Sequence, residues 1–201
     1  MVTHEEKARV FQALHENPGC FVIPNPWDRG SARMLAKLGF KALATTSAGF
    51  DFASGRVDGT ASLDEVLAHC KDLSEATDLP VSADMENCHA DTGEGIAETI
   101  RRAAATGLAG CSIEDLSDDR DNPIYEFSEA VDRVSAAVEA VRALPHPFTL
   151  TARAENFIRG NPDLDDTIKR LQAFQEAGAD VLYAPGPKTA DQIRDIVTSV
   201  D

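Results

Sequence analysis

Short apolar runs alternate along the chain with longer segments in which apolar residues recur every three or four positions. The short runs predict buried strands and the longer segments predict helices, an alternation typical of βα units around a parallel sheet. The predicted strands are Cys20–Pro24, Ala42–Thr46, Val81–Met85, Gly110–Glu114, Phe148–Ala152 and Val181–Ala184. The predicted helices are Ser31–Leu38, Leu63–Ala76, Gly95–Ala105, Ser128–Leu144, Leu164–Ala177 and Thr189–Val200, after a charged, helix-like stretch over 1–16.

One helix-to-strand junction recurs, with a glycine at the helix end followed by a buried strand, in segments 38–42, 105–110 and 176–181. Six such units suit an α/β fold of the (β/α)8 TIM-type barrel class better than a dinucleotide fold, because no Gly-x-Gly-x-x-Gly motif follows the first strand. A closed barrel needs two more strands. We therefore expect residues 1–201 to be a single barrel domain with its last strands missing, in preference to a barrel that is open at one side.

Composition narrows the range of partners. The 201 residues include 43% hydrophobic residues, enough for a sizeable core, and 19 Lys and Arg against 34 Asp and Glu give a formal net charge of −15. That charge repels nucleic acids and anionic membranes, and no apolar run approaches the roughly 20 residues of a membrane span. The four cysteines (Cys20, Cys70, Cys88 and Cys111) form no Cys-x-x-Cys pair. We expect a soluble, cytoplasmic protein that binds neither nucleic acid nor membrane.

Acidic residues collect where the predicted strands end, which is where parallel βα folds carry their sites. Asp84 and Glu86 end the third strand on the same face, Glu114 ends the fourth, and Asp58 lies in the loop after the second. Four ionised carboxylates around one mouth need compensation, by protonation of one of them, by Arg153 at the end of the fifth strand, or by a divalent cation. An oxygen-only ligand set suits Mg²⁺ or Mn²⁺.

Mg²⁺ usually takes one or two protein carboxylates and keeps several waters, so Asp84 is the expected direct ligand and the others act mostly through water. Arg153 then becomes the expected clamp for a substrate carboxylate, because its planar fork matches that group. The competing interpretation is that single acidic residues after strands only cap the next helix, as expected for Asp28. His69, His89 and His146 are interpreted as loop or surface residues, Cys111 as core, and Cys88 as a residue that could lie near the site.

Taken together and in order, several stretches resemble the isocitrate lyase and phosphoenolpyruvate mutase superfamily over nearly the whole chain. They begin at Asn25 (NPWDRGSAR), Ala44 (ATTSAGF), Arg56 (RVDG), Ser82 (SADMEN), Cys111 (CSIED) and Thr151 (TARAE). The resemblance implies a (β/α)8 barrel that assembles as a homo-oligomer, a dimer or tetramer, and binds Mg²⁺ with a 2-oxo acid or similar carboxylate. It also implies cleavage or formation of a C–C or P–C bond next to the carbonyl through an enolate-type intermediate.

Carried over residue by residue, the resemblance places Asp58, Asp84, Glu86 and Glu114 in the metal shell and Arg153 on the substrate carboxylate. The implied substrate-binding set also includes Thr46, Ser47, Ala48, Gly49, Phe50 and Glu155. Ala48 replaces a serine of the family, so Thr46, Ser47 and the Gly49 backbone are the expected substitutes as hydrogen-bond donors.

The loop after the fourth strand departs from the family pattern. Isocitrate and methylisocitrate lyases carry a Lys-Lys-Cys-Gly-His motif there with a catalytic cysteine, whereas segment 116–125 has none. Standard isocitrate lyase activity is therefore not expected. Arg120 and Asn122 match the Lys-x-Asn of phosphonomutases with arginine for lysine, although a solvated acidic loop is the favoured interpretation.

Three functions follow, in order of preference. The first is a Mg²⁺-dependent lyase that cleaves a C–C bond of a small 2-oxo acid or related carboxylate. The second is a phosphorus–carbon mutase or hydrolase, motivated by Arg120 and Asn122. Across these enzyme hypotheses, Arg153, Arg120 and Asn122 are the expected catalytic residues. The third is a barrel that binds a carboxylate without turning it over.

Overall fold

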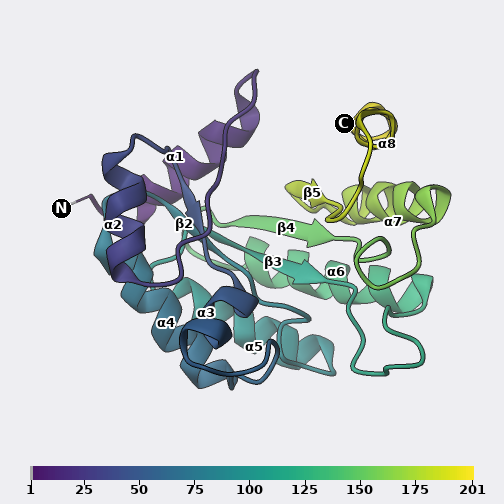
Figure 1. Ribbon diagram of the computed structural model, residues 1–201, viewed down its shortest axis with the longest axis horizontal. Helices are drawn as coiled ribbons and strands as arrows, with labels where there is room; N and C mark the ends of the chain where they lie inside the picture. The colour runs from purple at the N-terminus through teal and green to yellow at the C-terminus, as the bar shows by residue number, and fades with distance from the viewer. Residues whose placement is uncertain (1) are drawn as a thin grey trace.

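A computed structural model, which describes residues 2–201, contains one curved sheet of five parallel strands (Figure 1). The strands are β1 (Leu43–Ala44), β2 (Val81–Ala83), β3 (Gly110–Glu114), β4 (Thr149–Arg153) and β5 (Val181–Tyr183), and they lie side by side in chain order. Because all five are parallel, their carboxyl ends meet at one edge. The α/β class is confirmed, and the sheet forms about half of a TIM-type barrel.

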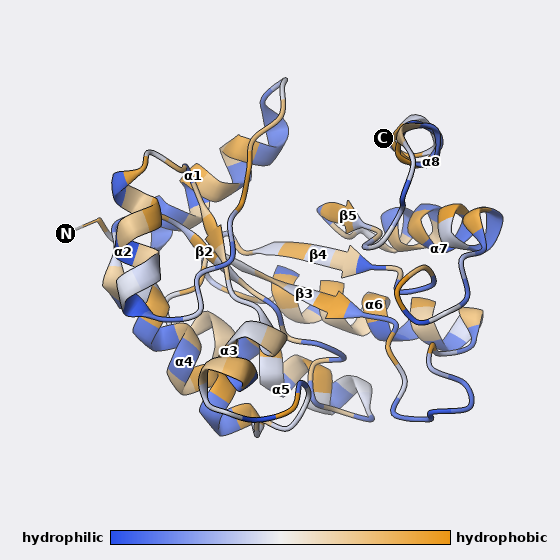
Figure 2. Ribbon diagram, in the orientation of Figure 1, coloured by the Kyte–Doolittle hydropathy of each residue, from blue (hydrophilic) through white to orange (hydrophobic). Residues whose placement is uncertain are grey.

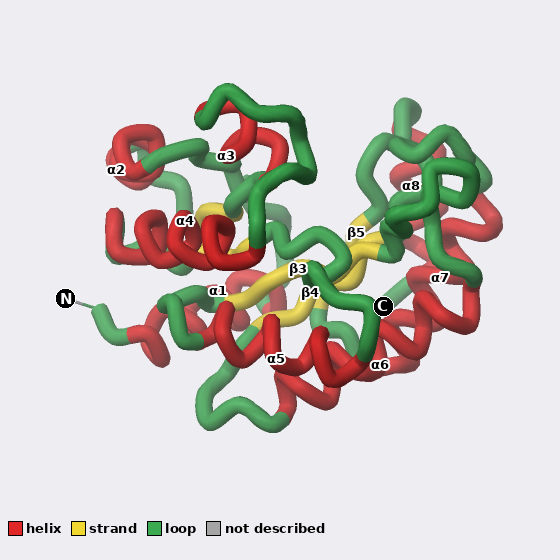
Figure 3. Tube along the Cα trace, turned by 90° about the horizontal axis from the view of Figure 1, so that it is seen from below, coloured by secondary structure: helices red, strands yellow, loops and turns green. Residues whose placement is uncertain are grey.

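Helices enclose the sheet on one side and at one end. They are α1 (His4–Glu16), α2 (Arg29–Lys37), α3 (Ser47–Ala53), α4 (Leu63–Ala76), α5 (Gly93–Ala104), α6 (Phe127–Arg142), α7 (Leu164–Ala177) and α8 (Ala190–Ser199). Figure 3 shows helices α4 to α7 following one another around the outside of the strands. Helix α1 is fastened to the end of α4, where Lys7 Nζ donates to the carbonyl oxygens of Ser74 (2.7 Å) and Thr77 (2.6 Å).

Alternate strand residues build the apolar core. Cys111, Ile113, Leu150 and Ala152 are almost fully buried and belong to one cluster with helix residues such as Ile100 and Phe174. Figure 2 shows apolar residues concentrated on the strands and on the helix faces that approach them. Cys111 is therefore a core residue, as predicted.

One predicted strand is absent. Segment 20–24 forms no ladder with β1; its one backbone hydrogen bond there is the Ala44 N–H donating to the Pro24 carbonyl. Proline has no N–H to donate, and the Asn25 side chain occupies the carbonyl oxygens of Ala44 (3.1 Å) and Thr45 (3.2 Å) instead. The prediction of a strand over 20–24 is therefore wrong, and residues 2–201 contain five of the six predicted strands.

The helix predictions agree more closely. Helices α4 and α7 have the predicted bounds, and Asp28 caps α2 by accepting from the Ser31 N–H, as expected. Segment 47–53, predicted as a loop, is helix α3, which begins at the N-cap Thr46. Within residues 2–201, no helix combines the length and the apolar character needed to cross a membrane.

Gly110 tests the close spacing of β3 and β4. A Cβ added there would lie against the carbonyl oxygen of Thr149, a backbone atom that can move only if the strands separate. We expect Gly110→Ala to lower the free energy of unfolding by about 2 kcal/mol or more in urea denaturation. Gly30→Ala is the control, because its Cβ would meet only the Asp28 side chain. Equal losses in the two variants would contradict the packing described here.

Candidate active site

A cavity of about 870 Å³ runs along the inner face of the sheet, from Phe11 and His15 of α1 to the carboxyl ends of the strands. The polar residues of β2, β3 and β4 that line it alternate with core residues. They are Ser82 and Asp84 from β2 and its end, Ser112 and Glu114 from β3, and Thr151 and Arg153 from β4. Because side chains two residues apart share a face, small polar groups line the cavity wall and charged groups stand at its carboxyl end.

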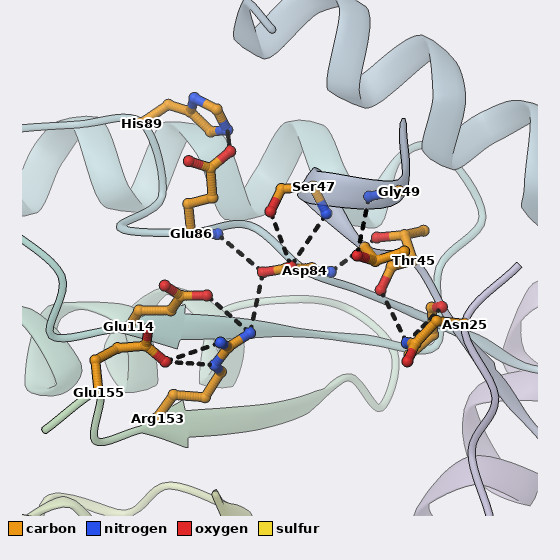
Figure 4. Close-up of polar contacts among 12 residues, drawn as sticks. Asn25, Thr45, Ser47, Gly49, Asp84, Glu86, His89, Glu114, Arg153 and Glu155 are labelled. Atoms are coloured by element: carbon orange, nitrogen blue, oxygen red, sulfur yellow. Dashed lines mark hydrogen bonds and ion pairs between the residues drawn. The ribbon is translucent and has the colours of Figure 1, made fainter. Parts of the chain in front are cut away.

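Arg153 lies at the centre of this charged group (Figure 4). Its Nη1 is 2.8 Å from Glu114 Oε1 and 3.3 Å from Asp84 Oδ1, and its Nη2 is 2.8 Å from Glu155 Oε1. Glu114 and Arg153 are register partners across β3 and β4, which explains their short contact. Since its Nε also donates to Glu155, every nitrogen of the guanidinium contacts a protein carboxylate. The predicted clamp on a substrate carboxylate would require one of these contacts to open.

Asp84 is held from the other side by the start of α3. The Ser47 backbone N–H and hydroxyl both donate to Asp84 Oδ2, each at 3.2 Å, and the Asp84 N–H donates to Thr45 Oγ1 at 2.9 Å. The two Ser47 donors fix the direction of the carboxylate, and the Thr45 hydroxyl fixes the backbone that carries it (Figure 4). Asp84 is therefore held in one orientation in which it lines the cavity.

Glu86 follows in a sharp turn. Its backbone has a φ of 51°, and Cys88 and His89 also have left-handed φ values of 64° and 49°, a conformation that costs free energy for residues other than glycine. Arg133 holds the turn by donating from Nη2 to the carbonyl oxygens of Asn87 (2.8 Å) and Ala90 (2.7 Å). The turn directs Glu86 into the cavity and buries Cys88 in the core.

The carboxylates outnumber the cations that face them. Burial, and then the charges of Asp84, Asp58 and Asp51, raise the pKa of Glu86 to about 7. Burial and the charge of Asp84 likewise raise the pKa of Glu114, against the opposing charge of Arg153. Burial is the largest cause of both shifts, and the neighbouring carboxylates add to it.

A second buried network supports the first. Asp115 Oδ1 accepts the Glu155 N–H at 2.8 Å, and its Oδ2 accepts Arg170 Nη1 at 3.0 Å. Glu155 itself is fully buried and pairs with Arg153 and with Arg159 Nε (3.2 Å). Glu155 therefore positions arginines and does not line the cavity, in contrast to the substrate contact predicted for it.

The structure gathers most of the predicted site residues. Those that line the cavity are Thr46, Ser47, Ala48, Asp58, Asp84, Glu86, Glu114, Arg120 and Arg153. Gly49, Phe50 and Asn122 do not. The Gly49 N–H donates to Oγ1 of Thr46, the N-cap of α3. A Cβ on Gly49 would lie 2.5 Å from the Trp27 ring.

Phe50 turns away from the cavity and stacks on His69 at a centroid distance of 4.2 Å. Asn122 is exposed and donates to Asp119 Oδ2 at 3.1 Å. Cys88, which sequence reasoning could place near the site, is fully buried in the core, and burial raises the pKa of its thiol to about 12.

Several cavity residues escaped sequence reasoning, among them Asn25, Thr45, Asp118, Arg159 and Tyr183. Asn25 and Thr45 lie within stretches that resemble the superfamily, and this position in the sequence could have identified them as site residues. Arg159 lies beyond the last such stretch and carried no signal of its own.

A hard divalent cation fits the chemistry of this donor set. Within residues 2–201, no three His, Cys, Asp or Glu side chains converge as a ready-made metal shell. Mg²⁺, which keeps several waters, does not require one. Asp84 presents its carboxylate to the cavity, and Glu86 lies there with a pKa that burial and the charges of neighbouring carboxylates raise.

Comparison with known proteins gives the family. A family model for phosphoenolpyruvate phosphomutase matches residues 11–201. The chain belongs to the phosphoenolpyruvate phosphomutase family. It is also similar to a crystal structure of a Burkholderia cenocepacia J2315 protein, a candidate lyase or mutase, with 54% identity and a TM-score of 0.95 over 98% of this chain and 70% of that one.

Curated relatives with specific enzyme names include both lyases and a mutase. The chain is 29% identical over 207 residues to a 2-methylisocitrate lyase of Bacillus subtilis, covering 96% of this chain and 64% of that protein. It is 27% identical over 200 residues to a chloroplastic carboxyvinyl-carboxyphosphonate phosphorylmutase of Arabidopsis thaliana, covering 92% and 57%. The chain therefore spans about three fifths of the length of each of these two relatives. The family thus includes lyases and mutases.

The Asp115 network yields a stability prediction. Asp115→Ala leaves the buried Arg170 without one carboxylate partner and the Glu155 N–H without its acceptor. We expect a loss of about 3 kcal/mol in the free energy of unfolding, measured by chemical denaturation. Asp121→Ala, in the exposed loop after β3, is the control and should change stability by less than about 0.5 kcal/mol. A loss at Asp115 no larger than the control's would rule out the supporting role.

Glu86 yields a pH prediction. Because its pKa is about 7 in the folded protein and ordinarily 4.5, the folded state binds the proton more tightly, and this stabilisation is lost as pH rises from about 4.5 to 7. We expect Glu86→Gln to gain stability relative to the natural protein by about 3 kcal/mol between pH 4.5 and pH 8, in buffer containing EDTA. The measurement is urea denaturation of both proteins at several pH values. A stability difference that does not change with pH would contradict the electrostatics described above.

Proposed function

We propose that the protein is a Mg²⁺-dependent lyase that cleaves a C–C bond next to the carbonyl of a small 2-oxo acid or related carboxylate, through an enolate intermediate. The observation that carries the proposal is the group of Asp84, Glu86, Glu114 and Arg153 at the carboxyl end of the cavity. The lyases of the family, such as the relative from Bacillus subtilis, support the reaction class.

The metal would be held chiefly by Asp84, with Glu86, Glu114 and Asp58 acting through water. When bound, Mg²⁺ would polarise the substrate carbonyl and stabilise enolate charge. Ser47 orients Asp84 by donating to its carboxylate, and Thr45 fixes the backbone beneath it. Mn²⁺ would fit the same oxygen donors.

The protein's own cations would complete the site. Arg153 and Arg159 both approach Glu114, at 2.8 Å and 3.8 Å, so positive charge stands at the carboxyl end of the cavity, and Arg153 would help to stabilise the enolate. Partial burial strengthens this interaction relative to water, since Arg153 is only 14% exposed. From the loop after β3, Ser117, Asp118 and Arg120 reach the cavity and would contact the group that leaves.

Phosphorus–carbon chemistry is the second candidate. Arg120 lines the cavity, as a phosphonomutase-like role would require, and the Arabidopsis relative supports the class. Asn122, its proposed partner, does not line the cavity, which favours the lyase. A barrel that binds a carboxylate without turnover is the third candidate, supported by Ala48 and the cysteine-free loop.

The deciding experiment is ¹H and ³¹P NMR of the protein with Mg²⁺ and, in separate tubes, oxaloacetate, methylisocitrate, 2,3-dimethylmalate and phosphonopyruvate. We expect C–C cleavage of at least one of the first three, and a loss of at least about 100-fold in kcat/KM in Asp84→Ala. Asp121→Ala should retain the activity.

The remaining outcomes separate the alternatives. Consumption of phosphonopyruvate alone would establish the second candidate. If no substrate is consumed but oxalate still binds in the presence of Mg²⁺, the third candidate, a barrel that binds a carboxylate without turnover, is supported. Failure to bind oxalate with Mg²⁺ would reject all three.

A further inference from the structure

Arg159 presents a guanidinium whose outer nitrogens have no hydrogen-bond partner among residues 2–201. Its Nε donates to the buried Glu155 Oε2 at 3.2 Å, which anchors the side chain. Its Nη2 lies 3.8 Å from Glu114 Oε2, beyond hydrogen-bond distance. The side chain is 33% exposed and lines the cavity. Two nitrogens with four N–H donors are thus available at the carboxyl end of the cavity.

Arg153 has no nitrogen free of a protein carboxylate. All three of its nitrogens contact Asp84, Glu114 or Glu155, and its exposed fraction is 14%. A ligand carboxylate reaches Arg153 only by displacing a protein carboxylate, whereas it reaches Arg159 by displacing water. Arg159 therefore has the planar fork free for bidentate recognition.

The backbone around Arg159 fixes its direction. The N–H groups of Ile158 and Arg159 both donate to the Glu155 carbonyl at 3.1 Å, and the Asn161 N–H donates to the Asn156 carbonyl at 3.0 Å. The Asn156 side chain in turn donates to Asp166 at the start of α7, at 2.8 Å. A loop held at several points loses little freedom when a ligand binds.

Charge decides which ligand group fits. A substrate bound at Asp84 and Glu86 brings any further acidic group close to a cluster of carboxylates, which repel it. Arg159 stands beside this cluster and can offset that repulsion. We infer that Arg159 binds a second anionic group of the substrate and makes the enzyme selective for 2-oxo acids that carry one.

This inference rests on the proposed function, because it assumes that the first carboxylate and the carbonyl bind at the Asp84 centre. The test compares oxaloacetate with pyruvate, which lacks the second carboxylate, by calorimetry with Mg²⁺. Turnover during the titration is checked by ¹H NMR, and oxalate with Mg²⁺ independently reports the Asp84 centre in the natural protein.

We expect the natural protein to bind oxaloacetate more tightly than pyruvate. Arg159→Gln should weaken the binding of oxaloacetate by about 10- to 100-fold and the binding of pyruvate by less than about 3-fold. Arg159→Lys keeps the charge but loses the planar fork, so its affinity for oxaloacetate should lie between those of the natural protein and Arg159→Gln. Arg101→Gln removes an exposed arginine that pairs with Glu98 on α5, and should leave both affinities unchanged.

Equal weakening of the two ligands in Arg159→Gln would overturn the inference, as would a natural protein that does not distinguish them. In either case bound oxalate would leave the proposed function standing. Absence of oxalate binding would reject both. Should Arg159→Gln fail to fold because Glu155 loses a partner, Arg159→Lys and the ligand comparison on the natural protein still decide the matter.

Discussion

Arg153 contacts Asp84, Glu114 and Glu155 at once, and this set of ion pairs allows three carboxylates to share the carboxyl edge of the sheet. Glu155 is fully buried and Glu114 nearly so, and an unpaired charge in either place would carry a large desolvation cost. The register of β3 against β4 brings Glu114 beside Arg153, and Asp115 holds the segment that supplies Glu155. The site therefore depends on strand pairing as much as on the charged residues.

The same strands serve the core and the cavity because their side chains alternate. Ile113 and Leu150 pack among the apolar residues, while Ser112 and Thr151 line the cavity wall. Small polar residues leave room for a ligand where larger apolar ones would fill the barrel interior. A rigid, polar-lined space with underneutralised carboxylates at one end is suited to binding a cation and an anionic molecule together.

Helices and the location of the site were predictable from the sequence where a single physical pattern determined them. Helices α4 and α7 and the acidic strand ends were readable, because helical periodicity and the common edge of parallel strands are strong constraints. The strand prediction for 20–24 was wrong because an apolar run does not show that the next segment breaks strand pairing. Pro24 has no N–H to donate, and the Asn25 side chain binds the carbonyl oxygens that a paired strand would use. Arg159 and the outward turns of Phe50 and Asn122 depend on loop geometry, which no local pattern encodes. The metal roles, the clamp role of Arg153 and the homo-oligomeric state stay predictions.

The central claim is that the carboxylates around Asp84 hold one divalent cation. Electron paramagnetic resonance of added Mn²⁺ measures this directly, because free and bound Mn²⁺ give different signal amplitudes. The account predicts one site per chain that Mg²⁺ competes for, that oxalate tightens, and that Asp84→Ala abolishes while Asp121→Ala leaves it intact. Absence of such a site, or one that survives in Asp84→Ala, would contradict it.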